Sequence, residues 1–288
     1  MSASPAARLR QLLKRKGCLV MPCCWDALSA RMIGAAGFDL TFMSGFAVSA
    51  ARIGAPDTGL ISLGEMVDQG RDICAASSIP VLGDGDTGHG NALNVRRTVE
   101  LYARAGFAAV MIEDQLAPKR CGHTRGKQVV GRDEALMRIR AAVDAREAGA
   151  DILILARTDA RTGHGLDEAL WRARAFAGTG ADILFVEAPQ GLEELRRIPA
   201  EAPGLHMANM LEGGKTPFLP AGELGAMGYS IAAYPLTLLS ASMKAMRDAL
   251  AVMKTGAHPD DALLDFAELR QIVGFDEYYE AENAYREE

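Results

Sequence analysis

Short apolar runs alternate with amphipathic stretches along most of the chain. In five places a small residue and a glycine end an amphipathic stretch and an apolar run follows: GAAGFDLTFMSG, ARAGFAAVMIED, REAGADILILARTD, AGTGADILFVEAP and GAMGYSIAAYP. The glycines, at positions 37, 106, 149, 180 and 228, can take the left-handed conformation that turns the chain from a helix end into a strand. The pattern therefore predicts five helix-to-strand junctions.

The predicted strands are continuous apolar runs, as expected for parallel strands that are buried on both faces. Three further runs, at 18–24, 79–86 and 205–210, bring the number of predicted strands to eight. The amphipathic stretches between strands include 62–77, 91–105 and 133–148. Eight strands that alternate with helices favour an α/β fold of the (β/α)8 TIM barrel type over an open doubly wound sheet.

The length of 288 residues is compatible with one such barrel, since these domains commonly have about 250 residues. No shift in composition marks a second domain. We expect residues 1–288 to form a single barrel domain with extra C-terminal helices from about residue 238.

Composition and charge narrow the class of protein. With 49% hydrophobic residues and no apolar run near the roughly 20 residues of a membrane span, we expect a soluble protein without a membrane partner. A net charge of −6 without a dense basic patch argues against nucleic-acid binding. Five cysteines without zinc-ligand spacing, and no secretory signal, predict a cytoplasmic protein with free thiols.

Polar residues gather where the predicted strands end. The loops that follow barrel strands converge on one mouth, and charged groups there must be paired or solvated to offset their desolvation. A barrel has no structural need for so many of them, so we predict a functional site. The strand-end residues are Ser44, Gly45, Asp84, Asp86, Glu113, Asp114, Arg157, Thr158, Asp159, Glu187 and Asn209.

Three of these acids suggest a metal. Asp84 and Asp86 lie two apart on a chain that we expect to be extended, which would place both on one side of the strand, and Glu113 reaches the same mouth from the next strand. Clustered carboxylates repel one another unless a cation neutralises them, and oxygen ligands suit Mg²⁺ or Mn²⁺. The alternatives are a solvated turn at Asp-Gly-Asp and a purely structural ion pair for Arg157.

The segment 116–130 is long for a loop between a strand and a helix, and such loops often act as lids. It contains Cys121 and His123 among several cations, Lys119, Arg120, Arg125 and Lys127. Neighbouring cations would favour the thiolate of Cys121 and make it chemically useful. The alternative is an exposed basic loop with an incidental cysteine.

The sequence resembles the isocitrate lyase and phosphoenolpyruvate mutase superfamily. The matching motifs occur in order: MSGFAVSAARIGAPDTG, GDGDTGHGNALNVRRTV, MIEDQLAPKRCGH, ARTDA, FVEAP and NMLEGGKTP. The resemblance implies a barrel whose eighth helix is exchanged with a neighbouring subunit, which gives a homotetramer built as a dimer of dimers. It also implies a Mg²⁺-dependent enzyme that acts on a small carboxylate.

The resemblance also assigns roles to single residues. It implies metal binding at Asp84, Asp86 and Glu113, and catalytic roles for Glu113, Cys121, His123 and Arg157. The residues implied in substrate binding are Ser44, Gly45, Phe46, Asp57, Gly122, Glu187, Asn209 and Pro235.

The 119–123 motif and Pro235 favour a carbon–carbon lyase within the superfamily, and Phe42 argues against methylisocitrate itself as the substrate. The motif Lys-Arg-Cys-Gly-His at 119–123 is similar to the one that marks the lyases. Pro235 stands where the oxaloacetate hydrolases of the superfamily have a serine, whereas Phe42 replaces a tyrosine of the methylisocitrate lyases. The sequence therefore predicts cleavage of a 2-hydroxy di- or tricarboxylate, of the 2,3-dimethylmalate or methylisocitrate type, into an oxo acid and a carboxylate.

Other functions stay open on the sequence alone. Oxaloacetate hydrolysis or decarboxylation is the main enzymatic alternative, and phosphonomutase chemistry is a weaker one, because those enzymes generally lack the cysteine of the 119–123 motif. A barrel that serves only as a binding or scaffold protein is the non-enzymatic alternative. Chemically useful residue types at every strand end argue against it.

Overall fold

The computed structural model describes residues 3–120 and 126–286. The chain divides into two compact units, Met1–Leu238 and Leu239–Glu288.

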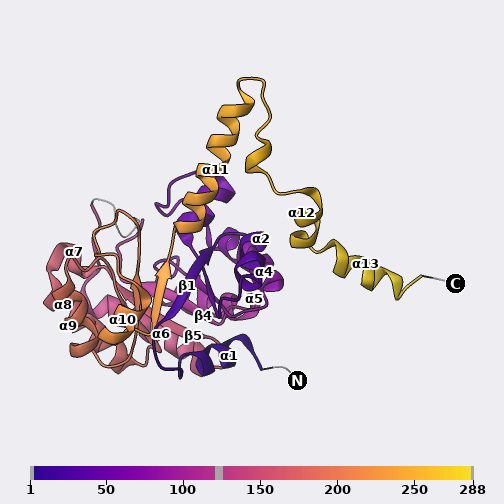
Figure 1. The fold of residues 1–288 in the computed structure, drawn as a ribbon. Helices are drawn as coiled ribbons and strands as arrows, with labels where there is room; N and C mark the ends of the chain where they lie inside the picture. The colour runs from indigo at the N-terminus through magenta and orange to yellow at the C-terminus, as the bar shows by residue number, and fades with distance from the viewer. Residues whose placement is uncertain (1–2, 121–125, 287–288) are drawn as a thin grey trace. The chain divides into compact units, whose positions relative to one another are not determined.

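The first unit is a closed barrel of eight parallel strands in sequence order, and β1 pairs with β8 to close it (Figure 1). This confirms the predicted (β/α)8 fold. The strands are β1 (Leu19–Cys24), β2 (Thr41–Met43), β3 (Val81–Asp84), β4 (Ala109–Glu113), β5 (Leu153–Thr158), β6 (Ile183–Val186), β7 (Leu205–Asn209) and β8 (Ile231–Tyr234).

Helices surround the barrel, and the three amphipathic stretches named above coincide within one residue with α4, α5 and α6. The helices of the first unit are α1 (Pro5–Leu12), α2 (Ala27–Ala35), α3 (Gly45–Val48), the π-helix η1 (Ser49–Ile53), α4 (Leu63–Ala76), α5 (Ala92–Ala105), α6 (Arg132–Glu147), α7 (Ala160–His164), α8 (Leu166–Thr179), α9 (Leu192–Glu201) and α10 (Ala221–Met227). The second unit contains most of α11 (Thr237–Met253), the 3-10 helix η2 (Asp260–Ala262), α12 (Phe266–Val273) and α13 (Phe275–Asn283).

Local sequence explains where several helices begin and end. Ser62 and Asn91 accept hydrogen bonds from the first turns of α4 and α5, as N-cap residues do. Gly106 ends α5 with φ +101°, and Gly180 ends α8 with φ +105°. These left-handed residues confirm the predicted turn from helix into strand.

The apolar side chains form two cores. One fills the barrel interior and extends to α1, whose buried residues Ala6 and Leu9 belong to the same cluster as Met21 and Leu155. The other lies between the strands and the surrounding helices. Because side chains from the strands and from α1 pack together in this cluster, the barrel interior is a packed core and not a pore.

None of the helices in the described part of the chain is long and apolar enough to cross a membrane.

Helix α5 supports the end of β3 from behind. The Tyr102 hydroxyl donates a hydrogen bond of 2.5 Å to the Asp84 carbonyl oxygen, and the Tyr102 ring stacks on Phe107 at 4.7 Å between centroids. A Cβ atom on Gly83 would lie 2.6 Å from Phe107 Cε1, so only glycine lets β3 approach these rings. One turn earlier on α5, Thr98 Oγ1 donates to the Gly88 carbonyl at 3.1 Å.

We expect Tyr102→Phe to lower the free energy of unfolding by about 1–3 kcal/mol, because the buried Asp84 carbonyl loses its side-chain donor. Urea denaturation measures the change. Tyr229→Phe is the matched control, since the Tyr229 hydroxyl is buried without a hydrogen-bond partner in the described structure. Equal stability of the Tyr102 variant and the native chain would contradict the supporting role of this hydrogen bond.

Candidate active site

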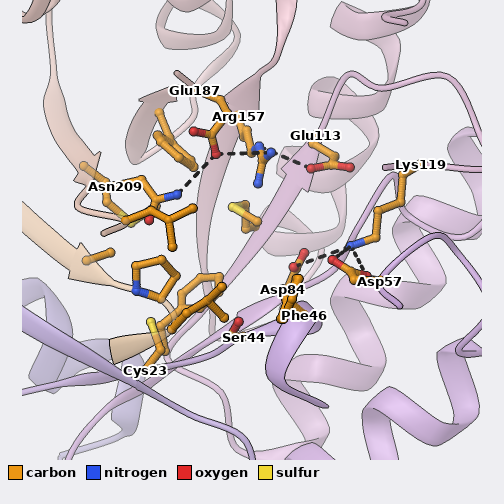
Figure 2. Close-up of a pocket in the computed structure, with 18 of the residues that line it drawn as sticks. Cys23, Ser44, Phe46, Asp57, Asp84, Glu113, Lys119, Arg157, Glu187 and Asn209 are labelled. Atoms are coloured by element: carbon orange, nitrogen blue, oxygen red, sulfur yellow. Dashed lines mark hydrogen bonds and ion pairs between the residues drawn. The ribbon is translucent and has the colours of Figure 1, made fainter. Parts of the chain in front are cut away.

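A pocket of about 620 Å³, including the space at its mouth, opens among the carboxyl ends of the barrel strands. Figure 2 shows polar side chains from several strands pointing into it. Nine of the residues predicted from the sequence line it: Ser44, Phe46, Asp57, Asp84, Glu113, Arg157, Glu187, Asn209 and Pro235. The barrel therefore brings together residues that are up to 191 positions apart in the sequence.

The other predicted site residues do not line the pocket in the described structure. Gly45 begins α3 directly behind the pocket-lining Ser44, and a Cβ atom there would lie 2.5 Å from Asp84 Oδ2. A glycine is therefore required for this close approach. The predicted residues Cys121, Gly122 and His123 lie outside the described residues.

Asp86 differs from the expectation of an extended strand with both aspartates on one side. Strand β3 ends at Asp84, and Asp86 has φ +51° in a turn in which Gly88 N–H donates to the Gly85 carbonyl. The Asp86 N–H donates to Asp84 Oδ1 at 3.0 Å, which favours the turn over continued strand. Asp86 thus lies beside the pocket wall formed by Asp84 rather than in it.

Lys119 lies among the acids, which the sequence analysis did not anticipate. Its Nζ is 2.7 Å from both carboxylate oxygens of Asp57, 2.7 Å from Asp86 Oδ1 and 3.9 Å from Asp84 Oδ2. In the sequence this lysine belongs to the group of cations around Cys121, which lies outside the described residues. The structure buries it as the partner of three carboxylates, of which Figure 2 shows Asp57 and Asp84.

Three acids in this part of the site have raised pKa values, because they are buried and lie close to other acids. Burial, opposed by Lys119 and reinforced by Asp84, raises the pKa of Asp86 to about 7. Burial also raises the pKa of Asp57, and it raises that of Glu113 well above its usual range. Additional positive charge next to these carboxylates would stabilise their ionised forms.

The donor set fits a hard divalent cation bound together with substrate or water oxygens. Within residues 3–120 and 126–286, no three acidic, imidazole or thiol groups lie close enough to hold a metal by themselves. However, Glu113 Oε1 is buried without a hydrogen-bond partner there, and Asp84 lies on the same pocket wall. Mg²⁺ usually takes one or two carboxylates and keeps its other positions for water and substrate oxygens.

On the other side of the pocket, Arg157 at the end of β5 joins the ends of β4 and β6. Its Nε lies 3.3 Å from Glu113 Oε2, and its Nη2 lies 3.2 Å from Glu187 Oε2 (Figure 2). Asn209 Nδ2 donates to the same Glu187 oxygen at 3.4 Å. Burial would lower the pKa of Arg157, but the carboxylates around it raise it well above its usual range, so the guanidinium is permanently charged.

The rest of the pocket wall is largely apolar, and sequence analysis identified only part of it. Its apolar members are Cys23, Phe42, Phe46, Met111, Phe185, Met207, Leu211, Ala233, Pro235 and Leu236. Cys23, Met111 and Met207 belong to strands that read as uniform core, so no sequence signal distinguished them. Only the direction in which each side chain points in the closed barrel decides that it lines the pocket.

The long loop after β4 has a firm base. Gln115 and Val129 form an isolated antiparallel bridge, and the Gln115 side chain bonds both the N–H and the carbonyl of Arg120. Arg138 on α6 donates to the Gln115 carbonyl at 2.7 Å. The two described arms of the loop are therefore fixed to the barrel next to the pocket.

Comparisons with known proteins agree with this geometry. The family model described as phosphoenolpyruvate phosphomutase matches residues 9–254. The chain is 44% identical over 283 residues to 2,3-dimethylmalate lyase from Eubacterium barkeri, and the match covers 97% of this chain and 98% of the relative.

Solved structures show the same likeness. Oxaloacetate acetylhydrolase in complex with 3,3-difluorooxalacetate superposes with a TM-score of 0.93 at 36% identity, covering 98% of this chain and 97% of the other. Phosphonopyruvate hydrolase in complex with oxalate and Mg²⁺ superposes with a TM-score of 0.87 at 28% identity, covering 98% and 99%. The chain belongs to the phosphoenolpyruvate mutase and isocitrate lyase superfamily.

Proposed function

We propose that this chain is a Mg²⁺-dependent lyase that cleaves a 2-hydroxy dicarboxylate of the 2,3-dimethylmalate type into an oxo acid and a carboxylate. The observation that carries the proposal is a pocket whose one wall is charged and whose other wall is apolar. The charged wall suits the carboxylate and hydroxyl oxygens of such an acid. The apolar wall suits alkyl substituents on its carbon chain.

Different residues of the charged wall would bind different groups of the substrate. The Ser44 N–H already donates to the Cys24 carbonyl at 3.1 Å, so its hydroxyl and the following N–H of Gly45 are the groups that would hold a substrate carboxylate. Arg157, fixed between Glu113 and Glu187, would bind substrate oxygens, and Asn209 would complete that side. Asp57 would act through Lys119, which it holds in place.

Cleavage breaks the C2–C3 bond of the substrate. The C2 hydroxyl loses its proton and becomes the carbonyl of the oxo acid, while the bonding pair stays on C3 as an enediolate that must be protonated. Asp84, Asp86 and Glu113 are the residues that would hold Mg²⁺, which supplies Lewis-acid stabilisation of charge on oxygen when bound. Arg157 would neutralise substrate charge, and Cys121, assisted by His123 and Gly122 of the same motif, would deliver the proton to C3.

We expect purified enzyme with Mg²⁺ to convert 2,3-dimethylmalate into pyruvate and propionate, and to lose that activity when a chelator removes the metal. Product chromatography in a screen of 2-hydroxy di- and tricarboxylates measures the conversion. Adding back Mg²⁺ or Mn²⁺ should restore the activity that the chelator removes, which controls for damage to the protein. Full activity in the chelator would contradict the metal assignment. Formation of acetate and oxalate from oxaloacetate, with no cleavage of any malate, would support the hydrolase alternative instead.

We expect Cys121→Ser to lower the turnover number by roughly 10²–10⁴-fold, the usual contribution of a positioned general acid. Steady-state kinetics with the best substrate measures it. Cys74→Ser is the control, because Cys74 is a free thiol on α4 and does not line the pocket. Unchanged turnover in the Cys121 variant would exclude the role of general acid.

We further propose that the C-terminal helices are an extension of one barrel domain, and that the eighth helix of the barrel, α11, is exchanged between subunits of a homotetramer. An exposed apolar stripe on α11 supports this. Met243, Met246, Leu250 and Met253 are each more than half exposed and recur every three or four residues on one helix face. Such a stripe normally packs against another surface.

We also propose a cytoplasmic location. Four described cysteines are free thiols, as is usual in a reducing compartment.

We expect sedimentation equilibrium to give a mass four times that of the 30.7 kDa chain. Leu250→Glu should shift the protein to a smaller species, because a charge on the stripe opposes its burial. Lys244→Glu is the control on the same helix, since its side chain is 71% exposed and lies three or four residues from no member of the stripe. A monomeric native protein would contradict the proposed exchange.

A further inference from the structure

The Asp159 carboxylate accepts three hydrogen bonds from two cations next to the pocket, although it does not line the pocket itself. Its Oδ2 accepts from Arg157 Nε at 2.8 Å, and its Oδ1 accepts from Arg157 Nη2 at 3.0 Å. Two parallel bonds of this kind fix the plane of a guanidinium as well as its position. The Asp159 side chain is fully buried, and the ion pairs with Arg157 and Lys127 hold its pKa well below the usual range against the effect of burial.

Asp159 is itself held by its neighbours. Its N–H donates to Asp114 Oδ1 at 2.9 Å, and the preceding Thr158 hydroxyl donates to Asp114 Oδ2 at 2.6 Å. Arg172 Nη1 on α8 reaches the same Asp114 oxygen at 3.0 Å. The carboxylate of Asp159 is therefore presented from a rigid turn at the end of β5.

The second cation on Asp159 comes from the loop that follows β4. Lys127 Nζ lies 2.6 Å from Asp159 Oδ1, and the Lys127 side chain is only 1% exposed. The sequence analysis counted Lys127 among the cations around Cys121, but the structure pairs it with the acid that holds Arg157. The Asp159 carboxylate thus contacts both Lys127 and the pocket-lining Arg157. Lys127 lies on the returning arm of the loop, which bridges to Gln115 at Val129.

These ion pairs fix the Nε and Nη2 edge of the Arg157 guanidinium. The contacts with Asp159, Glu113 and Glu187 use Nε and Nη2 of Arg157. Three carboxylates around one guanidinium also leave excess negative charge, which Lys127 offsets at Asp159.

We infer that Asp159 is a positioning residue that orients Arg157 toward the substrate, and that Lys127 couples the returning arm of the loop to this orientation. The inference rests on the proposed role of Arg157 in binding substrate oxygens. Neither Asp159 nor Lys127 needs to touch the substrate. Their effect is transmitted through the guanidinium of Arg157.

The test combines a crystal structure with ligand binding. We expect crystals of Asp159→Asn to show the Arg157 guanidinium turned away from its native plane, because an amide cannot accept both bonds. Calorimetry with oxalate as a small dianion, in the presence of Mg²⁺, should give a dissociation constant at least tenfold higher than that of the native protein. An unmoved guanidinium and an unchanged dissociation constant would overturn the inference.

Variants of Lys127 provide a second test. The single variants test the coupling even if Asp159→Asn does not fold, and the double-mutant cycle applies if it does. Lys127→Met should raise the dissociation constant for oxalate about threefold, and Lys127→Arg should restore it. In a double-mutant cycle, Asp159→Asn with Lys127→Met should bind oxalate no worse than Asp159→Asn alone, since both act through Arg157. Independent, additive effects, or no effect of Lys127→Met, would overturn the coupling.

A matched control separates positioning from general loss of stability. Asp182 also accepts from an arginine, Arg146 at 2.6 Å, and from the Ile154 N–H at 2.8 Å, but it precedes β6 at the opposite end of the barrel. Asp182→Asn should lower thermal stability without changing the affinity for oxalate. Since these readouts need no turnover, failure of the lyase assignment and failure of the Asp159 inference give different results.

Discussion

The structure of the site depends on how a few cations balance many buried carboxylates at one end of the barrel. Lys119 serves Asp57, Asp86 and Asp84, and Arg157 serves Glu113, Glu187 and Asp159. Isolated buried charges are costly, so each of these acids is retained only because a cation is near it. The balance is still negative around Asp84 and Glu113, and that local excess is what makes a divalent cation a natural further component.

The same electrostatic constraint explains why the loop after β4 is built as it is. Its first arm contributes Lys119 and its returning arm contributes Lys127, and both lysines are buried in ion pairs with acids from other parts of the barrel mouth. The loop therefore depends on the charge balance of the site as much as on its own backbone bridge between Gln115 and Val129. For Lys119 and Lys127 this excludes the alternative of an exposed basic loop, because both side chains are buried.

The pocket also explains why one barrel supports related but distinct reactions. In the proposed function, its charged wall would recognise a small acid, whereas Phe42, Leu211 and Pro235 on its apolar wall would face the remainder of the substrate. Changes confined to that apolar wall can alter which acid fits without disturbing the ion pairs. Strand ends provide the rigid platform, and the side chains between them decide the chemistry.

The sequence by itself determined the eight-stranded barrel, the helix ends at residues such as Gly106, and the polar strand ends including Glu113, Arg157 and Glu187. These features follow from local rules, namely apolar periodicity, the conformational freedom of glycine and the cost of placing charge in a buried strand. Only the tertiary structure decided that Asp86 turns out of the strand, that Lys119 lies among the acids and that Asp159 joins Arg157 to Lys127. Such pairings depend on which side chains meet across the mouth of a closed barrel, and neither spacing nor composition encodes that directly.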